Sequence, residues 1–147
     1  MSADKKPIKI LFFGDIVGKP GRIAVKNFLA KNRGSYDFII ANVENASHGF
    51  GLTEKNYNDI SDFGVDAMTS GNHIWDKREI FNYIENADKL LRPINYPRGS
   101  HGSGSRIFEK NGIKIIPSKR AGAVYLCLAG IAENDIPPAL EALKKVL

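Results

Sequence analysis

Polar side chains able to bind a metal ion or a phosphate group follow three apolar stretches of the sequence. Asp15 comes after the first stretch, Glu44 and Asn45 after the second, and Asn72 and His73 after the third. Carboxylate and amide oxygens together with an imidazole nitrogen suit Mn, Fe or Zn, and a bridging carboxylate can hold two such ions about 3.5–4 Å apart. Two ions at that distance polarise a phosphoryl group and generate the hydroxide that attacks it. These residue types therefore indicate metal-assisted phosphoryl chemistry.

Each of these polar positions follows a stretch that we predict to be a buried β-strand. The stretches are short, largely apolar and partly β-branched, as is typical of strands covered on both faces, and they comprise residues 8–13, 38–42 and 65–69. Helical segments separate them, so the order β-α-β-α-β-α implies parallel strands joined by right-handed crossovers. Parallel strands bring their carboxyl ends to one edge of a sheet, where α/β proteins bind ligands. We therefore expect the five polar residues to gather at one edge.

The predicted helices have recognisable starting points. A glycine-containing loop after Asp15 leads into a helix that ends near residue 30, and Thr53 is suited to be the N-cap of a second helix over about 54–63. Asp76 and Glu79 have the spacing of a capping box, which would open a third helix to about residue 87. Three crossover helices are thus expected.

The character of the chain changes after the third predicted helix. Residues 96–105 are rich in Gly, Ser and Pro and are predicted to form a loop. Asn111 and Gly112 lie between two apolar-bearing runs, which is the strongest short-range signal for a β-hairpin. Residues 124–128 have the composition of a strand, and Pro137 opens an amphipathic helix. The predicted fold class is therefore α/β, with a parallel core followed by a hairpin.

Each candidate site residue also has a purely structural alternative. Asp15 lies beside a glycine and could cap the helix that follows it. Glu44 and Asn45 could be solvated loop residues, and His73 could be an ordinary surface histidine. Because such residues follow three successive predicted strands, the sequence supports a shared site about as well as it supports these separate explanations.

A nucleotide-binding loop is a competing interpretation of the first polar segment. Residues 14–20 (GDIVGKP) are one residue short of the Gly-x-x-x-x-Gly-Lys-Ser/Thr pattern, and Pro20 stands where the Mg²⁺-binding hydroxyl belongs. A Gly-x-Gly-x-x-Gly pattern does not follow any of the predicted strands. The sequence gives this interpretation little support.

Composition limits the classes of protein that the chain could represent. Its 147 residues suffice for one domain with a core, and 43% hydrophobic and 25% charged residues argue against disorder. The net charge of +5 would suit an anionic partner, but the basic residues form neither a dense run nor a platform with aromatics, so nucleic-acid binding has little support. The single cysteine, Cys127, excludes a disulfide framework and suits a reducing, cytoplasmic setting. A membrane span would need about 20 apolar residues, which the sequence lacks.

Four sequence segments resemble one known family. They are GDIVGKPGR, ANVENASHGFGLT, TSGNHIWDKREI and LLRPINYP, at residues 14–22, 41–53, 69–80 and 90–97. In the same order and spacing, over about residues 8–116, they closely resemble the YmdB-like branch of the calcineurin-like metallophosphoesterases. The resemblance implies a four-layer α/β/β/α sandwich, two divalent or trivalent metal ions (Fe or Mn, with Zn as a further option), and phosphodiesterase activity. A small phosphodiester such as 2′,3′-cyclic AMP is the implied substrate.

The resemblance also implies a role for each candidate residue. Asp15 would bind one metal, Glu44 would bridge both metals or bind near them, and Asn72 would bind the second metal. Asn45 falls at a further position of the site, in contact with the substrate or the second metal. His73 would stand near the leaving oxygen, as a proton donor or as a stabiliser of charge on the phosphate.

The sequence departs from the family pattern in three ways. Val43 stands where the family usually has glycine, which is expected to tighten the loop that carries Glu44. Family members are considerably longer, and their distal half supplies several metal-binding histidines, whereas His48, His73 and His101 are the only histidines of this chain. The resemblance is also expected to break over residues 117–122 and to resume weakly near Val124.

These departures predict a single domain over residues 1–147 that is truncated in its distal half, from a shortened or frame-disturbed gene. Without the distal histidines the metals should bind weakly, because water would fill the open coordination positions. We therefore expect little or no phosphodiesterase activity from the chain alone. The alternative is a non-catalytic binding or assembly module of the same fold, in which uncovered apolar surface favours association with another copy, as a homo-oligomer, or with a separate distal half.

Overall fold

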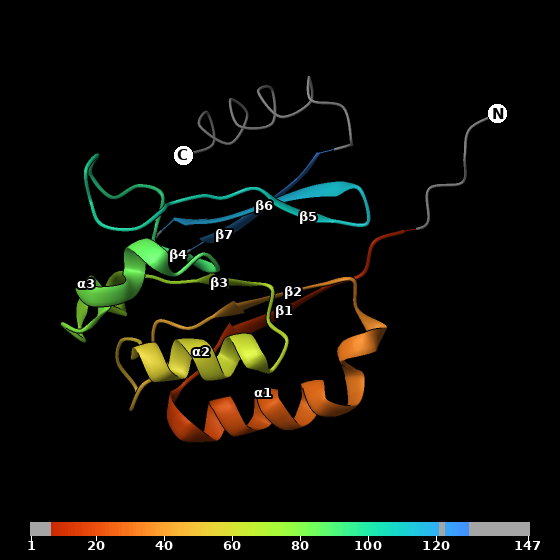
Figure 1. Ribbon diagram of the computed structural model, residues 1–147, viewed down its shortest axis with the longest axis horizontal. Coiled ribbons are helices and arrows are strands. Elements are labelled where there is room, and N and C mark those ends of the chain that lie inside the picture. Colours follow the sequence, from red (N-terminus) through yellow and green to blue (C-terminus); the bar gives the residue numbers. More distant parts are fainter. Residues whose placement is uncertain (1–6, 121–122, 130–147) are drawn as a thin grey trace.

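Two sheets and two longer helices form three stacked layers in the computed structural model, which describes residues 7–120 and 123–129 (Figure 1). Helices α1 (Gly18–Asn32) and α2 (Glu54–Asp62) cover one face of the middle layer, and the second sheet lies over its other face. The middle layer is a parallel sheet whose strands follow chain order, namely β1 (Ile10–Asp15), β2 (Phe38–Asn42), β3 (Ala67–Thr69) and β4 (Leu90–Leu91). The predicted parallel β-α-β-α-β core is confirmed.

The second sheet is antiparallel and contains the predicted hairpin. Its strands are β5 (Phe108–Lys110), β6 (Ile113–Arg120) and β7 (Ala123–Ala129). Between β5 and β6, Asn111 and Gly112 have φ values of 52° and 73°, and a type I′ hairpin turn requires positive φ at both central residues. The hairpin and the strand predicted near residues 124–128 are confirmed. The helix predicted from Pro137 lies outside the described residues.

Two apolar cores hold the three layers together. The core between the helices and the parallel sheet includes Leu29 of α1, Ile39 of β2 and Ile60 of α2. The core between the two sheets includes Phe38 and Ile40. Successive side chains of a strand point to opposite faces, so β2 contributes to both cores and is buried along its whole length. This is why its sequence is a continuous apolar run.

The helix starts agree only in part with the prediction. Thr53 is the N-cap of α2, and its hydroxyl accepts a hydrogen bond from the backbone N–H of Asn56 at 3.2 Å. The predicted capping box is wrong, because the Asp76 carboxylate is hydrogen-bonded to His73 at 2.7 Å instead. One long third helix is replaced by three short pieces, η2 (Asn72–Trp75), α3 (Ile80–Tyr83) and η3 (Ile84–Asn86). None of the helices in residues 7–120 and 123–129 is long and apolar enough to cross a membrane.

The register of the parallel sheet aligns the carboxyl ends of its strands. Asp15 pairs with Asn42, and Asn42 pairs with Thr69. Asp15 is the last residue of β1 and does not lie beyond it, because the strand continues two residues further than predicted. Glu44 and Asn72 follow the ends of β2 and β3 within three residues. The polar residues therefore do gather at one edge of the sheet.

Candidate metal and phosphate site

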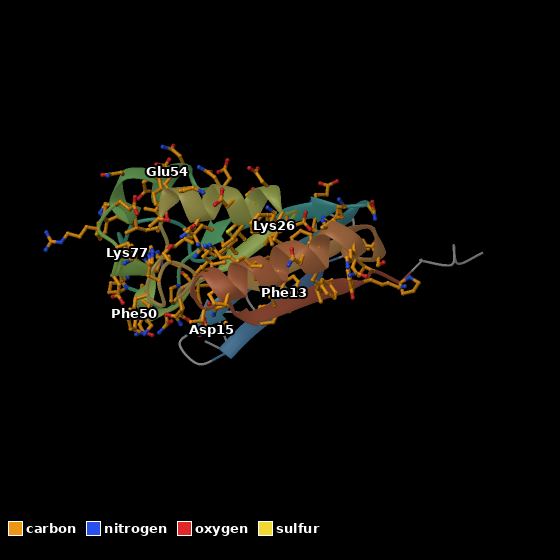
Figure 2. All side chains as sticks on the ribbon, turned by 90° about the horizontal axis from the view of Figure 1, so that it is seen from below. Phe13, Asp15, Lys26, Phe50, Glu54 and Lys77 are labelled. Atoms are coloured by element: carbon orange, nitrogen blue, oxygen red, sulfur yellow. The ribbon has the colours of Figure 1, made fainter. Side chains whose placement is uncertain are left out.

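Asp15 faces the loop that follows β2. Both of its carboxylate oxygens accept hydrogen bonds from the Nδ2 group of Asn45, at 3.0 and 2.8 Å. The N-cap of α1 is Val17, so the interpretation of Asp15 as a helix cap is wrong. Figure 2 shows Asp15 at the same end of the molecule as Phe50 and Lys77. The carboxylate is exposed to solvent and available to a ligand at that end.

Within the described part of the chain, the other half of the Asn45 amide has no hydrogen-bond partner. Because an ionised carboxylate only accepts hydrogen bonds, the Nδ2 group must face Asp15, which fixes the direction of the Oδ1 oxygen. That oxygen is buried and has no hydrogen-bond partner among the described residues. An unsatisfied buried acceptor costs about 1–3 kcal/mol and calls for a partner such as an ion or a water. A cation beside Asp15 and Asn45 would satisfy it.

Glu44 is the buried carboxylate of the site. It is only 8% exposed, and its Oε1 and Oε2 oxygens accept hydrogen bonds from Nδ2 of Asn42 at 3.2 Å and from the backbone N–H of His73 at 3.4 Å. The carboxylate lies against Gly71, where a Cβ atom would meet Oε2 at 2.1 Å. Glycine is therefore required next to Glu44 for steric reasons.

The segment that carries Glu44 and Asn45 is held to strand β3 on one side and to the start of helix α1 on the other. The backbone N–H of Val43 donates to Thr69 at 2.9 Å, and the N–H of Gly18 donates to the carbonyl of Asn45, also at 2.9 Å. Val43 itself is completely buried. Glu44 and Asn45 therefore lie in a turn after β2 that is held in place, and the interpretation of Glu44 as a solvated residue is wrong, because its side chain is buried.

His73 is oriented by two neighbours. Its Nδ1 atom lies 2.7 Å from a carboxylate oxygen of Asp76, and its ring lies 5.5 Å from the ring of Phe50 between centroids. Because the Asp76 carboxylate can only accept, Nδ1 carries the proton, and Nε2 is the nitrogen left for a substrate. The side chain is 35% exposed. An imidazole held by a carboxylate and still open to solvent is arranged as a proton-transfer group.

The candidate ligands form only part of a metal shell. Asn72 lies at the same edge, directly after Gly71, and is exposed. Among residues 7–120 and 123–129, no group of three or more His, Cys, Asp or Glu side chains lies close enough to hold a metal ion. The site thus offers carboxylate and amide oxygens, with Asp15 and Asn45 in one contact and Glu44 and His73 in another.

Two functional residues were missed by the sequence analysis. Gly71 makes room for Glu44, and Asp76 orients His73. A glycine directly after a strand and before two candidate ligands is a signal for close approach. The spacing of Asp76, three residues after His73, was assigned to helix capping, although it equally permits a carboxylate–imidazole pair.

The chain is similar to proteins of known description. It is 45% identical over 121 residues to the 2′,3′-cyclic-nucleotide 2′-phosphodiesterase of Bacillus subtilis, a match that covers 81% of this chain and 46% of that protein. A protein of Thermus thermophilus of solved structure has a TM-score of 0.74 at 32% identity over 92% of this chain and 52% of its own. A phosphatase of solved structure from Mycoplasma pneumoniae has a TM-score of 0.72 at 37% identity, over 80% of this chain and 44% of its own. The predicted calcineurin-like α/β fold class is confirmed, with three of its layers in the described residues.

The similarity concerns one part of longer proteins. The chain spans between 41% and 46% of the length of the curated relatives that it matches. A family model described as YmdB-like protein matches residues 11–129, a range that includes both the expected break at 117–122 and the region near Val124. Because the matched range covers most of the sequence, the chain belongs to the YmdB-like protein family.

Proposed function

We propose that this chain supplies one side of a metal-dependent phosphodiesterase site for small phosphodiesters such as 2′,3′-cyclic AMP. The observation that carries the proposal is the pairing at one sheet edge of Asp15 with Asn45 and of Glu44 with the backbone of His73. The Bacillus subtilis relative named as a cyclic-nucleotide phosphodiesterase supports the substrate class. Asp15, Glu44 and Asn72 would hold the metal, with Asn45 as a further ligand or substrate contact.

The residue types at the site suit such ions, but the site offers fewer ligand atoms than two ions require. Two carboxylates and two amides provide the hard oxygen donors that Mn and Fe accept, and the Oδ1 oxygen of Asn45 is a buried ligand atom that the described residues leave without a partner. When bound, two ions would polarise the phosphoryl group and supply a hydroxide nucleophile. With so few protein donors, we expect weak metal binding and little hydrolysis by residues 1–147 alone.

His73 would act on the substrate through Nε2. As the imidazolium it would give its proton to the leaving ribose oxygen, while Asp76 holds the Nδ1 proton and stabilises the positive ring. Phe50 lies beside the same ring. Asn45 would keep the Asp15 carboxylate turned toward the site.

Metal binding by the purified chain tests this proposal. Titration with Mn²⁺, followed by calorimetry, should show weak binding that Asp15→Ala and Glu44→Gln each reduce at least tenfold. Asp62→Ala is the matched control, because Asp62 is an exposed carboxylate at the end of α2. Equal binding in all variants would contradict the site. Vigorous Mn²⁺-dependent hydrolysis of 2′,3′-cyclic AMP that Asp15→Ala abolishes would contradict the expected lack of activity.

An assembly module of the same fold is the second candidate, favoured by apolar exposure along β1 and α1. In the described part of the chain β1 pairs only with β2, and Phe12 of β1 is 42% exposed. On α1, Ile23 is 46% and Phe28 38% exposed. Such surface favours association, with a second copy or a larger partner. Size-exclusion chromatography separates the two: a monomer that binds no hydrophobic dye speaks against assembly.

A further inference from the structure

An open pocket lined by aromatic rings lies at the end of the molecule that carries the candidate site. It has a volume of about 350 Å³ and is contributed by η2, by the start of α3 and by the loop after β4, with lining residues Trp75, Phe81, Tyr96, Pro97, Ser100 and His101. In Figure 1, α3 and this loop lie at the end of the parallel sheet where its strands terminate. The pocket belongs to the same edge as His73.

The rings of the pocket form a continuous set. Trp75 and Phe81 are stacked, with centroids 5.4 Å apart and planes 8° apart. Tyr96 lies 5.9 Å from Trp75 on one side, and His101 meets Phe81 edge-on at 5.1 Å on the other. Phe81 remains 45% exposed. Large aromatic surface held open to solvent in this way suits a planar apolar ligand.

The wall formed by His101 is connected to Glu85 by a hydrogen bond. Nδ1 of His101 lies 3.1 Å from the Glu85 carboxylate, which also accepts the backbone N–H of Gly102 at 3.0 Å. These contacts, the Gly102 N–H first and the imidazole second, lower the pKa of Glu85. Gly102 has a φ of +72°, and a Cβ there would lie 2.8 Å from Ile84, so the loop packs closely on η3. The pocket is therefore preformed on this side.

We propose that this pocket binds the nucleobase of the phosphodiester substrate. Trp75 and His73 are two residues apart in the same short 3₁₀ helix, which corresponds to about 4 Å of rise. A nucleotide carries both a phosphate for His73 and a planar ring for the aromatic wall, on neighbouring parts of one ligand. The inference rests on the proposed function, because it assigns the base-binding part of that same site.

Trp75 makes the pocket directly observable. It is the only tryptophan of the chain, so a base that stacks in the pocket should quench the tryptophan fluorescence of the metal-free protein. The probes are adenosine, 2′,3′-cyclic AMP and glycerol 1,2-cyclic phosphate, which has no base. Saturable quenching by the first two and none by the third is the expected result. Absence of quenching by both base-containing probes overturns the proposal.

Substitution of Phe81 provides the second measurement. Stacking on one aromatic ring corresponds to roughly a 5- to 150-fold difference in affinity, so Phe81→Ala should weaken adenosine binding within that range. Phe81→Leu keeps apolar volume while it removes the ring, and should weaken binding as well. Phe12→Ala is the control, because Phe12 is similarly exposed at 42% but lies on β1. Unchanged affinity in both Phe81 variants overturns the proposal.

The same titrations with Mn²⁺ present separate this inference from the proposed function. Adenosine binding that depends on Phe81, with no further gain for 2′,3′-cyclic AMP over adenosine, supports the pocket and contradicts the phosphodiester site. Binding of glycerol 1,2-cyclic phosphate that requires Asp15, without any quenching by adenosine, supports the phosphodiester site and overturns the pocket.

Discussion

Replacement of Gly71 by alanine should displace Glu44 without unfolding the protein. The new Cβ would lie 2.1 Å from Oε2, 2.5 Å from Oε1 and 2.6 Å from Cδ of Glu44, whereas ordinary non-bonded contacts are about 3.5 Å. The carboxylate must therefore move by more than about 1 Å, away from Asn42 and from the backbone N–H of His73. The φ of Gly71 is −135°, which alanine adopts readily, so the effect is steric.

The magnitude follows from this forced overlap. Overpacking of a closed site costs about 1–3 kcal/mol of unfolding free energy, and loss of the supporting contacts of a metal ligand lowers affinity about 10- to 100-fold. Gly14→Ala is the matched control, because among the described residues a Cβ at Gly14 meets nothing within 4 Å. Both variants share the effect of alanine on the unfolded chain, about 0.4–1 kcal/mol, so it largely cancels between them.

Urea unfolding and Mn²⁺ titration of the two glycine variants are the assays. Gly14→Ala should bind Mn²⁺ like the original protein and be more stable by about 0.4–1 kcal/mol, whereas Gly71→Ala should be less stable than Gly14→Ala and lose at least tenfold in Mn²⁺ affinity. If Gly71→Ala matched Gly14→Ala in both measurements, the close approach of Glu44 to Gly71 would be refuted.

Further substitutions test other contacts of the fold and the site. Asp76→Asn removes the carboxylate that holds the Nδ1 proton of His73. Mn²⁺ binding should persist, whereas nitrogen NMR should show a changed tautomer of the His73 ring. An unchanged NMR spectrum would contradict the assigned orientation of the ring. Asp66→Ala removes both hydrogen bonds from Arg33 and should cost about 1.5–3 kcal/mol in urea unfolding; a smaller loss than for an exposed Asp→Ala change elsewhere would argue against this pair. The pKa of Glu85 is lowered on folding, mainly by a backbone hydrogen bond, from an ordinary value of 4.5, so its contribution is complete above about that pH and is lost as the pH falls through the folded value. Unfolding of Glu85→Gln should therefore differ from that of the original protein above about pH 5 and converge with it in acid; a constant difference would refute this assignment.

Local sequence signals account for most of the features of the fold that were predicted correctly. The apolar run of residues predicted where β2 begins and ends, because all side chains of this strand are buried, on both faces of the sheet. Thr53 caps α2 through its own hydroxyl, and Asn111 with Gly112 turns the chain between β5 and β6 through positive φ angles. In each case the cause lies within a few residues of the chain. Such features need no knowledge of distant contacts.

The errors arose where a side chain had a competing partner. Asp76 was expected to cap a third helix, but the imidazole of His73 occupies its carboxylate, and the region folds as short helical pieces. Asp15 could equally have capped α1, yet its carboxylate faces Asn45 from a different strand end. Residue spacing alone could not decide between a helix cap and the observed partner. In each case either arrangement would provide hydrogen-bond donors to the same carboxylate.

The sequence by itself determined that Asp15, Glu44 and Asn72 would reach a common edge, because parallel strands in chain order align their carboxyl ends. Only the tertiary structure decided how these groups meet: that Glu44 is buried against Gly71, and that Asn45 turns one end of its amide to Asp15 and leaves the other unsatisfied. The same holds for the aromatic pocket, whose rings come from segments up to 26 residues apart, from Trp75 to His101. The physical reason is that such contacts depend on packing between segments, and strand periodicity carries no information about that packing.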